Sequence, residues 1–429
     1  MMERIEEIRE EIRTAKTPRA RREEGGVIAY LRSPMAIRER CGKLFSLACE
    51  DRLSHFYCDL SRLGRVADYV IEVIREQYPD LQIPFHSRWR HFEAGGVPRL
   101  TQLDGLTAGL SPVERAAAKF DLVIVSVLLD AGAGERWQYY EQETGLVFRR
   151  SEGLAVASFQ MFCQGAFSSN SDSLTDAQGL QGLTEEMLLA GFQVNPENPL
   201  VGVAGRLGLL QRLGRALLSS PQMFGFENPR PGHLVNYLLE RSSNGQLAAE
   251  TVLSAVLEGL GDIWPGRLEI AGVNLGDVWL HQFTDRSSKA STVLVPFHKL
   301  SQWLTYSLLE PLQELGLEIT GLDALTGLPE YRNGGLCLDL GLLQVKHPDI
   351  LQQRHAIGSE VVVEWRALTV ILLDHIATAV REALGMSAEE LPLVKVLQGG
   401  TWSAGRRIAA QLRSGGVPPI QIESDGTVF

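Results

Sequence analysis

The spacing of apolar and polar positions along the chain predicts a protein built mainly of helices. Ser33-Pro34 and Ser111-Pro112 each place a capping serine before a proline at the first helical position. Residues 122–129 are apolar on every side and also fit a buried strand, but the cap at Ser111 favours a helix. Helical spacing covers about 3–15, 34–50, 63–77, 112–130, 184–191, 199–218, 232–241, 246–260, 297–314 and 360–384.

Strand-like alternation is short and local. It covers Leu268–Val273, Thr292–Val295 and Leu336–Val345, and the segment from Pro419 to the end fits a hairpin around Asp425-Gly426. The chain shows neither a doubly wound order of strands and helices nor a repeat of about 20–50 residues. We therefore expect a mainly α-helical fold with small antiparallel β elements. No Ser/Gly/Pro-rich linker marks a boundary, so we expect residues 1–429 to form one unit, compact or bilobed.

Composition and charge narrow the class of protein. The 429 residues are 45% apolar and 22% charged, which excludes wholesale disorder. A net charge of −11 disfavours binding to nucleic acid. No apolar run reaches the length of about 18 residues that a membrane span needs. The first residues are charged where a signal peptide is apolar, and the five cysteines include no CxxC pair, so we expect a cytoplasmic protein.

Two segments in the first half of the chain concentrate charged and aromatic side chains. Arg88, Trp89 and His91 lie in the segment 84–96 and suit a surface that binds an anion or a ring. The alternative is a turn packed by aromatic rings, with its arginines in solvent. Asp130 and Glu152 are candidate carboxylates in the segment 128–155, or else members of an ordinary cap or salt bridge.

A third segment is the start of the helix expected over 297–314. His298 and Gln302 are four residues apart, and Lys299 and Gln302 three apart, so they share a face. A helix N-terminus with a lysine favours an anionic ligand, and a solvated first turn is the alternative.

The fourth segment, 327–336, is expected to be a loop shaped by Pro329 and by Gly334-Gly335. It presents Glu330, Tyr331, Arg332 and Asn333 in succession. A carboxylate, a phenol, a guanidinium and an amide suit a polyhydroxylated ligand, whereas a purely structural loop is the alternative.

The helix expected over 360–384 carries charge inside an apolar stretch. Glu364 and Arg366 interrupt residues that are apolar all round, which is the pattern of a buried helix. Buried charges are costly, so these two must be paired, with each other or elsewhere, or must face a ligand. Glu360 shares a face with Glu364.

Known catalytic and metal motifs are absent. The chain contains no HExxH, no EF-hand loop and no GxSxG elbow. We predict no cofactor, although the carboxylates leave room for a divalent metal. From the residues alone, the prediction is a polar pocket with carboxylates and anion-binding groups.

Eight longer segments are spread along the chain: FHSRWRHFEAGG, SVLLDAGAGERWQYYE, RSEGLAVASFQMF, LVPFHKLSQWLTYSLLEPL, LTGLPEYRNGGL, VVEWRALTVILLD, GGTWSAGR and SDGTVF. Through these segments, nearly the whole chain resembles the uracil-catabolism family of fungi and bacteria. This is the family of the fourth protein in the yeast uracil-catabolism set, long described as a domain of unknown function. The resemblance implies a role in a pathway that converts uracil through ribosylated intermediates, ribosylurea among them.

Three short segments also resemble, in the same order, motifs of the queuosine salvage glycosylases. They are His298-Lys299-Leu300-Ser301-Gln302, Pro329-Glu330-Tyr331-Arg332 and Glu364-Trp365-Arg366-Ala367. Glu330 stands where that family has aspartate. Because those glycosylases look related to the all-helical DNA glycosylases, the resemblance implies a helical glycosylase-like fold.

These resemblances imply hydrolysis of a C–N glycosidic bond in a small ribosylated ureide, through an oxocarbenium-like transition state. Glu330 would stabilise the positive charge and activate water. Lys299 and Arg332 would hold a phosphate or a ribose hydroxyl. Gln302 or Asn333 would hold the ureide.

The other candidate contact residues complete this hypothesis. Trp89 and His91 would close the far wall of the pocket, and Arg88, His298, Tyr331, Glu364 and Arg366 are further candidate contacts. The expected partner is thus a small molecule, with no nucleic acid and no membrane, and the oligomeric state stays open.

Two other classes of function stay open. One is a metal-dependent amidohydrolase acting on the urea moiety, with Asp130, Glu152, His298 and Asp339 as ligands. The other is a non-catalytic binding protein of the same pathway.

Overall fold

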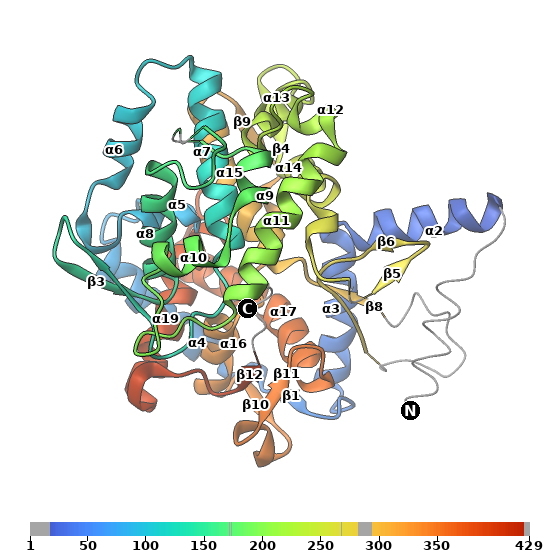
Figure 1. Ribbon diagram of the computed structural model, residues 1–429. Helices are drawn as coiled ribbons and strands as arrows, with labels where there is room; N and C mark the ends of the chain where they lie inside the picture. The colour runs from blue at the N-terminus through green and yellow to red at the C-terminus, as the bar shows by residue number, and fades with distance from the viewer. Residues whose placement is uncertain (1–17, 171, 173, 267, 282–293, 424–429) are drawn as a thin grey trace. The chain divides into compact units, whose positions relative to one another are not determined.

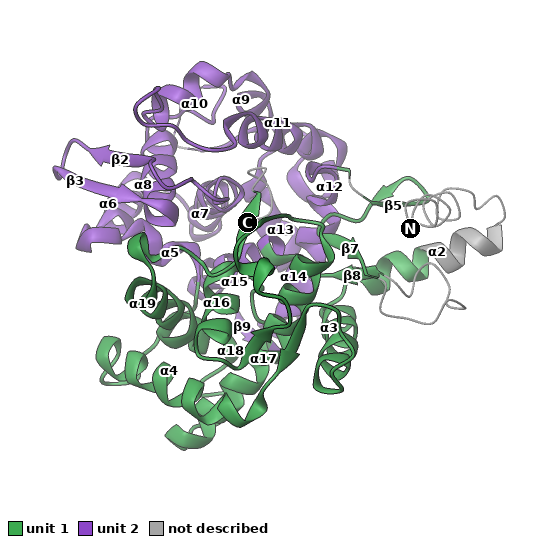
Figure 2. Ribbon diagram, turned by 90° about the horizontal axis from the view of Figure 1, so that it is seen from below, with its two compact units in different colours: residues 1–86, 266–299, 322–423 green, residues 87–265, 300–321, 424–429 purple. Residues whose placement is uncertain are grey.

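The computed structural model describes residues 18–423 except 171, 173, 267 and 282–293. The described part is mainly helical, with short strands that pair two by two (Figure 1). This confirms the predicted fold class. The helix expected over 3–15 lies outside the described residues. The described residues form two compact units (Figure 2): those in 18–86, 266–299 and 322–423 make unit 1, and those in 87–265 and 300–321 make unit 2.

Unit 1 is assembled from three separate stretches of chain. Its helices are α2 (Pro18–Leu31), α3 (Pro34–Cys49), α4 (Leu63–Gln77), α16 (Tyr331–Asp339), α17 (Glu360–Leu384), α18 (Leu393–Val396) and α19 (Trp402–Leu412). Its strands are β1 (Phe56–Cys58), β5 (Glu269–Ile270), β6 (Val273–Asn274), β7 (Val278–Leu280), β8 (Leu294–Pro296), β10 (Leu343–Val345), β11 (Arg354–Ala356) and β12 (Gln421–Glu423).

The long helix α17 forms the core of unit 1. It packs against α3, α4 and α16, and its side chains from Val361 to Val370 are all buried. It begins after Ser359 and ends at Gly385, whose left-handed backbone (φ 66°) only glycine adopts readily. These are the bounds that the sequence pattern predicts, because the apolar stretch and both end signals are local.

Glycines allow α19 and α16 to approach each other closely. A Cβ at Gly405 would lie 2.2 Å from the backbone oxygen of Arg332. A second glycine allows a close contact with α4. A Cβ at Gly400, in a π-helical turn at Leu397–Thr401, would lie 2.5 Å from the side chain of Val70 in that helix. Part of the GGTWSAGR segment is therefore a packing motif.

Strand β7 is held in place by a small apolar cluster. Val278 packs with Leu31, Ile270, Leu275 and Leu294, which come from α2, β5, the turn before β7 and β8. The antiparallel pair β7–β8 thereby fixes the two residues that flank β7, which are Asp277 and His281.

Unit 2 is a second helical assembly. Its helices are α5 (Arg88–Phe92), α6 (Arg99–Leu106), α7 (Pro112–Leu128), α8 (Arg150–Cys163), α9 (Ala177–Gly182), α10 (Glu185–Gly191), α11 (Val203–Ser219), α12 (Pro221–Phe224), α13 (Leu234–Leu239) and α14 (Ala249–Gly259). Its strands are β2 (Gln138–Glu141), β3 (Leu146–Arg149), β4 (Gln246–Ala248) and β9 (Glu318–Thr320). Helix α15 (Lys299–Glu314) starts with the last residue of a unit 1 stretch and continues in unit 2.

The caps predicted from the sequence are present. The side chain of Ser33 accepts the N–H of Ala36 at the start of α3, and Ser111 accepts that of Glu114 at the start of α7. Residues 122–128 are helical, as the cap at Ser111 indicates.

The strand predictions are confirmed only in part. The strand expected over Leu336–Val345 is wrong up to Asp339, because those residues belong to α16, and only Leu343–Val345 forms a strand. The first strand of the expected C-terminal hairpin is present as β12, which pairs in parallel with β11, whereas the expected turn at Asp425-Gly426 and the return strand lie outside the described residues. The pair β4–β9 is also parallel, whereas the other four pairs in the described part of the chain are antiparallel.

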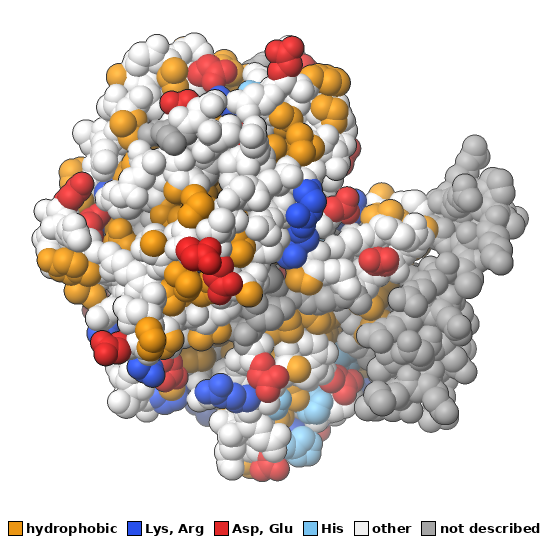
Figure 3. Space-filling view, in the orientation of Figure 1, with side chains coloured by type: hydrophobic (Ala, Val, Ile, Leu, Met, Phe, Trp, Pro, Cys, Tyr) orange, Lys and Arg blue, Asp and Glu red, His pale blue; other side chains and the backbone are white. Residues whose placement is uncertain are grey.

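No helix in the described residues combines the length and apolar character needed to cross a bilayer. On the face seen in Figure 3, acidic, basic and apolar side chains are interspersed.

Candidate functional site

Asp277 joins the separate segments of a polar cluster in unit 1. Arg366 of α17 donates two hydrogen bonds to its carboxylate, from Nη1 to Oδ1 at 2.8 Å and from Nη2 to Oδ2 at 2.7 Å. The backbone N–H of Lys299 donates to Oδ2 at 3.0 Å, and Trp279 Nε1 donates to Oδ1 at 2.6 Å. One carboxylate thus positions both the start of α15 and the middle of α17.

The pair formed by Asp277 and Arg366 is ionised. Burial disfavours the charged carboxylate, but the charge and hydrogen bonds of Arg366 outweigh burial, and the pKa of Asp277 lies well below its ordinary value. The guanidinium also stacks 4.1 Å from the ring centre of Phe297, and Arg366 Nε lies 3.5 Å from the carbonyl oxygen of Pro329. Arg366 therefore reaches from Asp277 to the residue that precedes Glu330.

Glu330 is the N-cap of α16. Its Oε2 accepts the N–H of Arg332 at 2.7 Å and its Oε1 accepts that of Asn333 at 2.6 Å. The loop expected at 327–336 is therefore wrong from Tyr331 onward, since those residues are helical. The glycines serve packing there, because a Cβ at Gly334 would lie 2.6 Å from Nε1 of Trp365.

The Glu330 carboxylate is buried, with 8% of the residue exposed. Burial raises its pKa above the ordinary value, and the two backbone N–H groups and the charges of Lys299 and Arg332 only partly oppose this rise. Each carboxylate oxygen has a further lone pair beyond the cap hydrogen bond. Glu330 is thus a carboxylate with a raised pKa beside two cations.

Arg332 and Asn333, two further residues of the predicted site, are also buried, whereas Tyr331 is partly exposed. Arg332 donates to the carbonyl oxygen of Gly416 at 2.7 Å, and its guanidinium lies 4.9 Å from the ring centre of Tyr331. Asn333 donates to the carbonyl oxygen of Leu328 at 3.1 Å, while its Oδ1 has no hydrogen-bond partner among the described residues. A buried amide oxygen in this state is a group that a ligand with an N–H can satisfy.

Glu364 and Arg366 do not pair with each other. Two residues apart on a helix, they point to different faces, and each finds another partner. Glu364 accepts the N–H groups of Ser54 at 3.3 Å and His55 at 3.1 Å, and its Oε1 lies 3.3 Å from His281 Nε2. The expectation that these buried charges need partners is confirmed, but the partners come from distant segments.

Glu364 also belongs to a group of three described side chains whose types and spacing are those of metal ligands. Ligand atoms of His281, Glu360 and Glu364 lie within 4.8 Å of one another. His281 directly follows β7, so this group and the Asp277 cluster are built from the same strand and the same helix. Neither His281 nor the strand before it carries a sequence motif, and the spacing of Glu360 and Glu364 is the one signal that points to the group.

The structure gives other partners to three of the four residues considered as metal ligands. Asp339 accepts hydrogen bonds from Nη1 and Nη2 of Arg413, at 2.8 and 2.5 Å. His298 Nε2 lies 2.9 Å from the carbonyl oxygen of Leu31, and burial lowers the pKa of its imidazole. Asp130 pairs with an arginine of unit 2, so that set has no support as a metal site.

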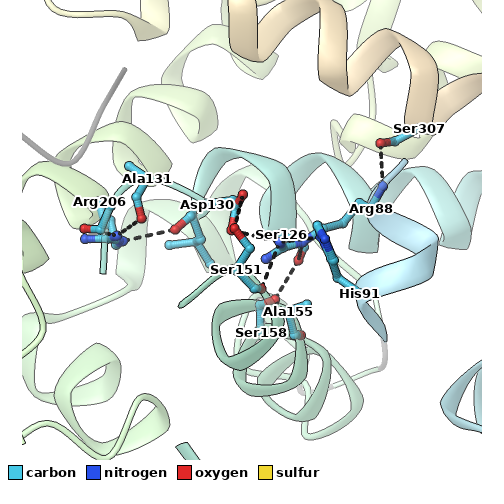
Figure 4. A network of polar contacts seen from close by, with 12 residues as sticks. Arg88, His91, Ser126, Asp130, Ala131, Ser151, Ala155, Ser158, Arg206 and Ser307 are labelled. Carbon is cyan, nitrogen blue, oxygen red and sulfur yellow. Dashed lines mark hydrogen bonds and ion pairs between the residues drawn. The ribbon is translucent and has the colours of Figure 1, made fainter. Parts of the chain in front are cut away.

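That arginine is Arg88, at the centre of a buried network in unit 2 (Figure 4). Its Nη1 donates to Asp130 Oδ1 at 2.8 Å and to the carbonyl oxygen of Ser151 at 3.1 Å. Its Nε donates to Ser126 Oγ at 2.8 Å, and Ser126 Oγ lies 2.7 Å from Ser158 Oγ. Most of the guanidinium is thus engaged within the protein, although Nη2 has no partner among the described residues.

The remaining candidates in unit 2 are core residues in the described structure. Trp89 donates to the carbonyl oxygen of Ser307 at 2.7 Å and packs on Phe92, with 3% of it exposed. His91 is buried against the edge of Trp303, and Gln302 is fully buried.

Fold and site together define a mainly helical protein with a buried polar centre in unit 1. A model of a family described as "Protein of unknown function (DUF1688)" matches residues 30–429, and the chain belongs to this family. Protein urg3 of Schizosaccharomyces pombe is 42% identical over 413 residues, which cover 94% of this chain and 99% of that protein. Uracil catabolism protein 4 of Lachancea kluyveri is 39% identical over 437 residues, with the same coverage of 94% and 99%.

Proposed function

We propose that this protein acts in uracil catabolism and hydrolyses the C–N glycosidic bond of a ribosylated ureide, either ribosylurea or its phosphate. The first part rests on the relative named Uracil catabolism protein 4, which is similar over 94% of this chain. The second part rests on the resemblance to queuosine salvage glycosylases and on the site in unit 1.

One observation carries the proposed reaction. Lys299 and Arg366 both donate to Asp277, and Arg366 Nε lies 3.5 Å from the carbonyl oxygen of Pro329, the residue before Glu330. These residues come from the three segments that resemble the glycosylase motifs. Asp277 lies outside all three motifs, so their meeting was not built into the resemblance. Convergence of three distant segments on one buried carboxylate centre is what a shared active site requires.

Glu330 is assigned the central chemical role. As the glycosidic bond breaks, positive charge develops at C1′, and an adjacent carboxylate stabilises it. The same carboxylate accepts a proton from the water whose oxygen bonds to C1′, and this proton passes to the departing ureide nitrogen, so that neutral urea is released. The N-cap hydrogen bonds hold both oxygens in a fixed orientation, so that little reorganisation accompanies the reaction.

The other groups are assigned to binding. Lys299 and Arg332 both act electrostatically on the Glu330 carboxylate, and as cations they suit a phosphate or a ribose hydroxyl. The unsatisfied Oδ1 of Asn333 suits an N–H of the ureide.

The test is incubation with ribosylurea and with its 5′-phosphate, with separate assays for urea, ammonia and free ribose or ribose phosphate. The wild type should release urea together with the sugar. Glu330→Gln should lower kcat by about 10²–10³ while substrate still binds, since it removes charge and keeps shape. Glu330→Asp should keep partial activity, because the glycosylases that the motifs resemble use aspartate.

A matched control separates chemistry from loss of a helix cap. Asp176 is a buried acidic N-cap of α9 in unit 2, where it accepts the N–H of Gly179 at 2.7 Å. Asp176→Asn should therefore retain the rate. Wild-type turnover by Glu330→Gln would remove the assignment. Ammonia without free sugar would indicate an amidohydrolase, and unchanged pathway flux with Glu330→Gln would indicate a binding protein.

A further inference from the structure

Glu360 and Glu364 of α17 form an unusual acidic pair in unit 1. Glu364 is almost fully buried, with 1% of its side chain exposed. Among the described residues, the basic groups that contact these two carboxylates are His55 and His281, with no lysine or arginine. The buried carboxylates of Asp121, Asp130 and Glu141, by contrast, each pair with an arginine. Buried carboxylates are typically paired with a cation or bound to a metal ion.

The distances in this group fit ligands of one ion better than hydrogen bonds. His281 Nε2 lies 3.3 Å from Glu364 Oε1 and 3.6 Å from Glu360 Oε1. Hydrogen bonds from N–H to oxygen are typically about 2.7–3.2 Å long. Two ligands bound to Zn²⁺ at about 2.0–2.2 Å lie about 3.3–3.6 Å apart in a tetrahedral site.

The surroundings hold the ligand atoms in place. The N–H groups of Ser54 and His55 both donate to the Glu364 carboxylate, and such outer hydrogen bonds orient the carboxylates of metal sites. His281 is fixed at the end of β7, and Glu360 and Glu364 lie one turn apart on α17. His55 Nε2 lies 3.6 Å from Glu360 Oε2, so a second imidazole borders the group.

From this geometry we infer that His281, Glu360 and Glu364 bind a divalent transition-metal ion. One imidazole and two carboxylates suit the borderline cation Zn²⁺ or the harder cation Mn²⁺ rather than soft Cu⁺. Three protein ligands leave a coordination position for water or a substrate oxygen. This inference does not depend on the role assigned to Glu330, because His281 lies at the opposite end of β7 from Asp277, and because Glu330, Lys299 and Arg332 are not among the three ligands.

The experiment is direct metal binding by the untagged full-length protein. The protein is stripped with a chelator, dialysed and titrated with Zn²⁺ and, separately, Mn²⁺ in a calorimeter, and bound metal is counted by elemental analysis. We expect one ion per chain and a melting temperature that rises with added metal. Glu364→Gln should weaken binding by at least about 100-fold, since loss of outer-shell partners alone costs about 10–100-fold.

Two further variants keep the test decisive. Glu360 is partly exposed, so Glu360→Gln should fold even if Glu364→Gln does not, and it should also weaken binding. Glu382→Gln changes an exposed glutamate on the same helix and should bind like the wild type. Absence of saturable binding by the wild type would overturn the inference, as would equal affinity in Glu360→Gln, Glu364→Gln and Glu382→Gln. Neither result bears on the release of free sugar, which tests Glu330.

Discussion

Replacing Arg366 by methionine tests the centre of the proposed site. Methionine replaces the unbranched stem of the arginine with an apolar side chain but lacks the guanidinium. The substitution therefore removes both hydrogen bonds to the Asp277 carboxylate, at 2.8 and 2.7 Å. Among the described residues, the remaining donors to the Asp277 carboxylate are then Trp279 Nε1 and the Lys299 N–H. A carboxylate is left in a buried position without its counter-charge.

The expected loss is large. Removing one partner of a buried, hydrogen-bonded ion pair typically costs about 3–5 kcal/mol, because the remaining charge is uncompensated. Loss of the contact between the guanidinium and the Phe297 ring acts in the same direction. With a urea dependence of about 3 kcal/mol/M, the unfolding midpoint should fall by about 1–2 M.

Urea unfolding of a small set of variants measures this loss. Arg366→Met is compared with Arg407→Met, whose arginine forms exposed ion pairs with Glu72 and Glu76. The midpoint of Arg407→Met should hardly change, since exposed pairs contribute little. Asp277→Asn combined with Arg366→Met should recover part of the loss, because no buried charge remains.

The pH dependence of stability tests the same ion pair in a second way. In the wild type the pKa of Asp277 is held below its ordinary value, so the pair stabilises above that ordinary value and its contribution is lost as the pH falls through the lowered pKa. Without Arg366, burial raises the pKa of Asp277, and protonation relieves the penalty. The difference in unfolding free energy between the wild type and Arg366→Met should therefore become smaller as the pH falls from 7 to 4. Two results would refute the reasoning. One is an unchanged urea midpoint of Arg366→Met. The other is a double variant whose loss of unfolding free energy equals the sum of the losses in Arg366→Met and Asp277→Asn.

Two further predictions concern packing and catalysis. Gly405→Ala places a Cβ 2.2 Å from the backbone oxygen of Arg332 and should cost at least about 1–3 kcal/mol in urea unfolding, whereas Gly42→Ala, in open space on α3, should be neutral or stabilising. Burial raises the pKa of Glu330, so if its carboxylate must be ionised, kcat/KM for the ribosylated ureide should fall on the acid side through a pKa above that of an exposed glutamate. An acid limb at or below that ordinary value would contradict this role.

The sequence alone determined the elements whose signals are local. α17 has its predicted bounds because the apolar stretch, Ser359 and Gly385 all lie within the helix or next to it. The serine caps of α3 and α7 are local in the same way. The need of Glu364 and Arg366 for partners was likewise predictable, because a charge among apolar residues is costly wherever the chain folds.

Local patterns were misleading where side-chain packing decides the structure. Residues 336–345 alternate like a strand, and Gly334-Gly335 suggests a loop, yet both stretches contribute to α16. The carboxylate of Glu330 caps this helix, and Gly334 makes room for Trp365 on α17. Glycine spacing does not by itself distinguish a turn from a close helix contact.

Only the tertiary structure decided which groups meet in the candidate site. Asp277 and His281 flank a strand of three residues and belong to no motif. Asp277 binds Arg366, 89 residues further along the chain, and His281 contacts Glu364, 83 residues further along. The apolar cluster around Val278 sets the position of β7 against α17, and this position pairs the charges. Periodicity reports which face of an element is buried, whereas the partner of a buried charge depends on which distant element packs against that face.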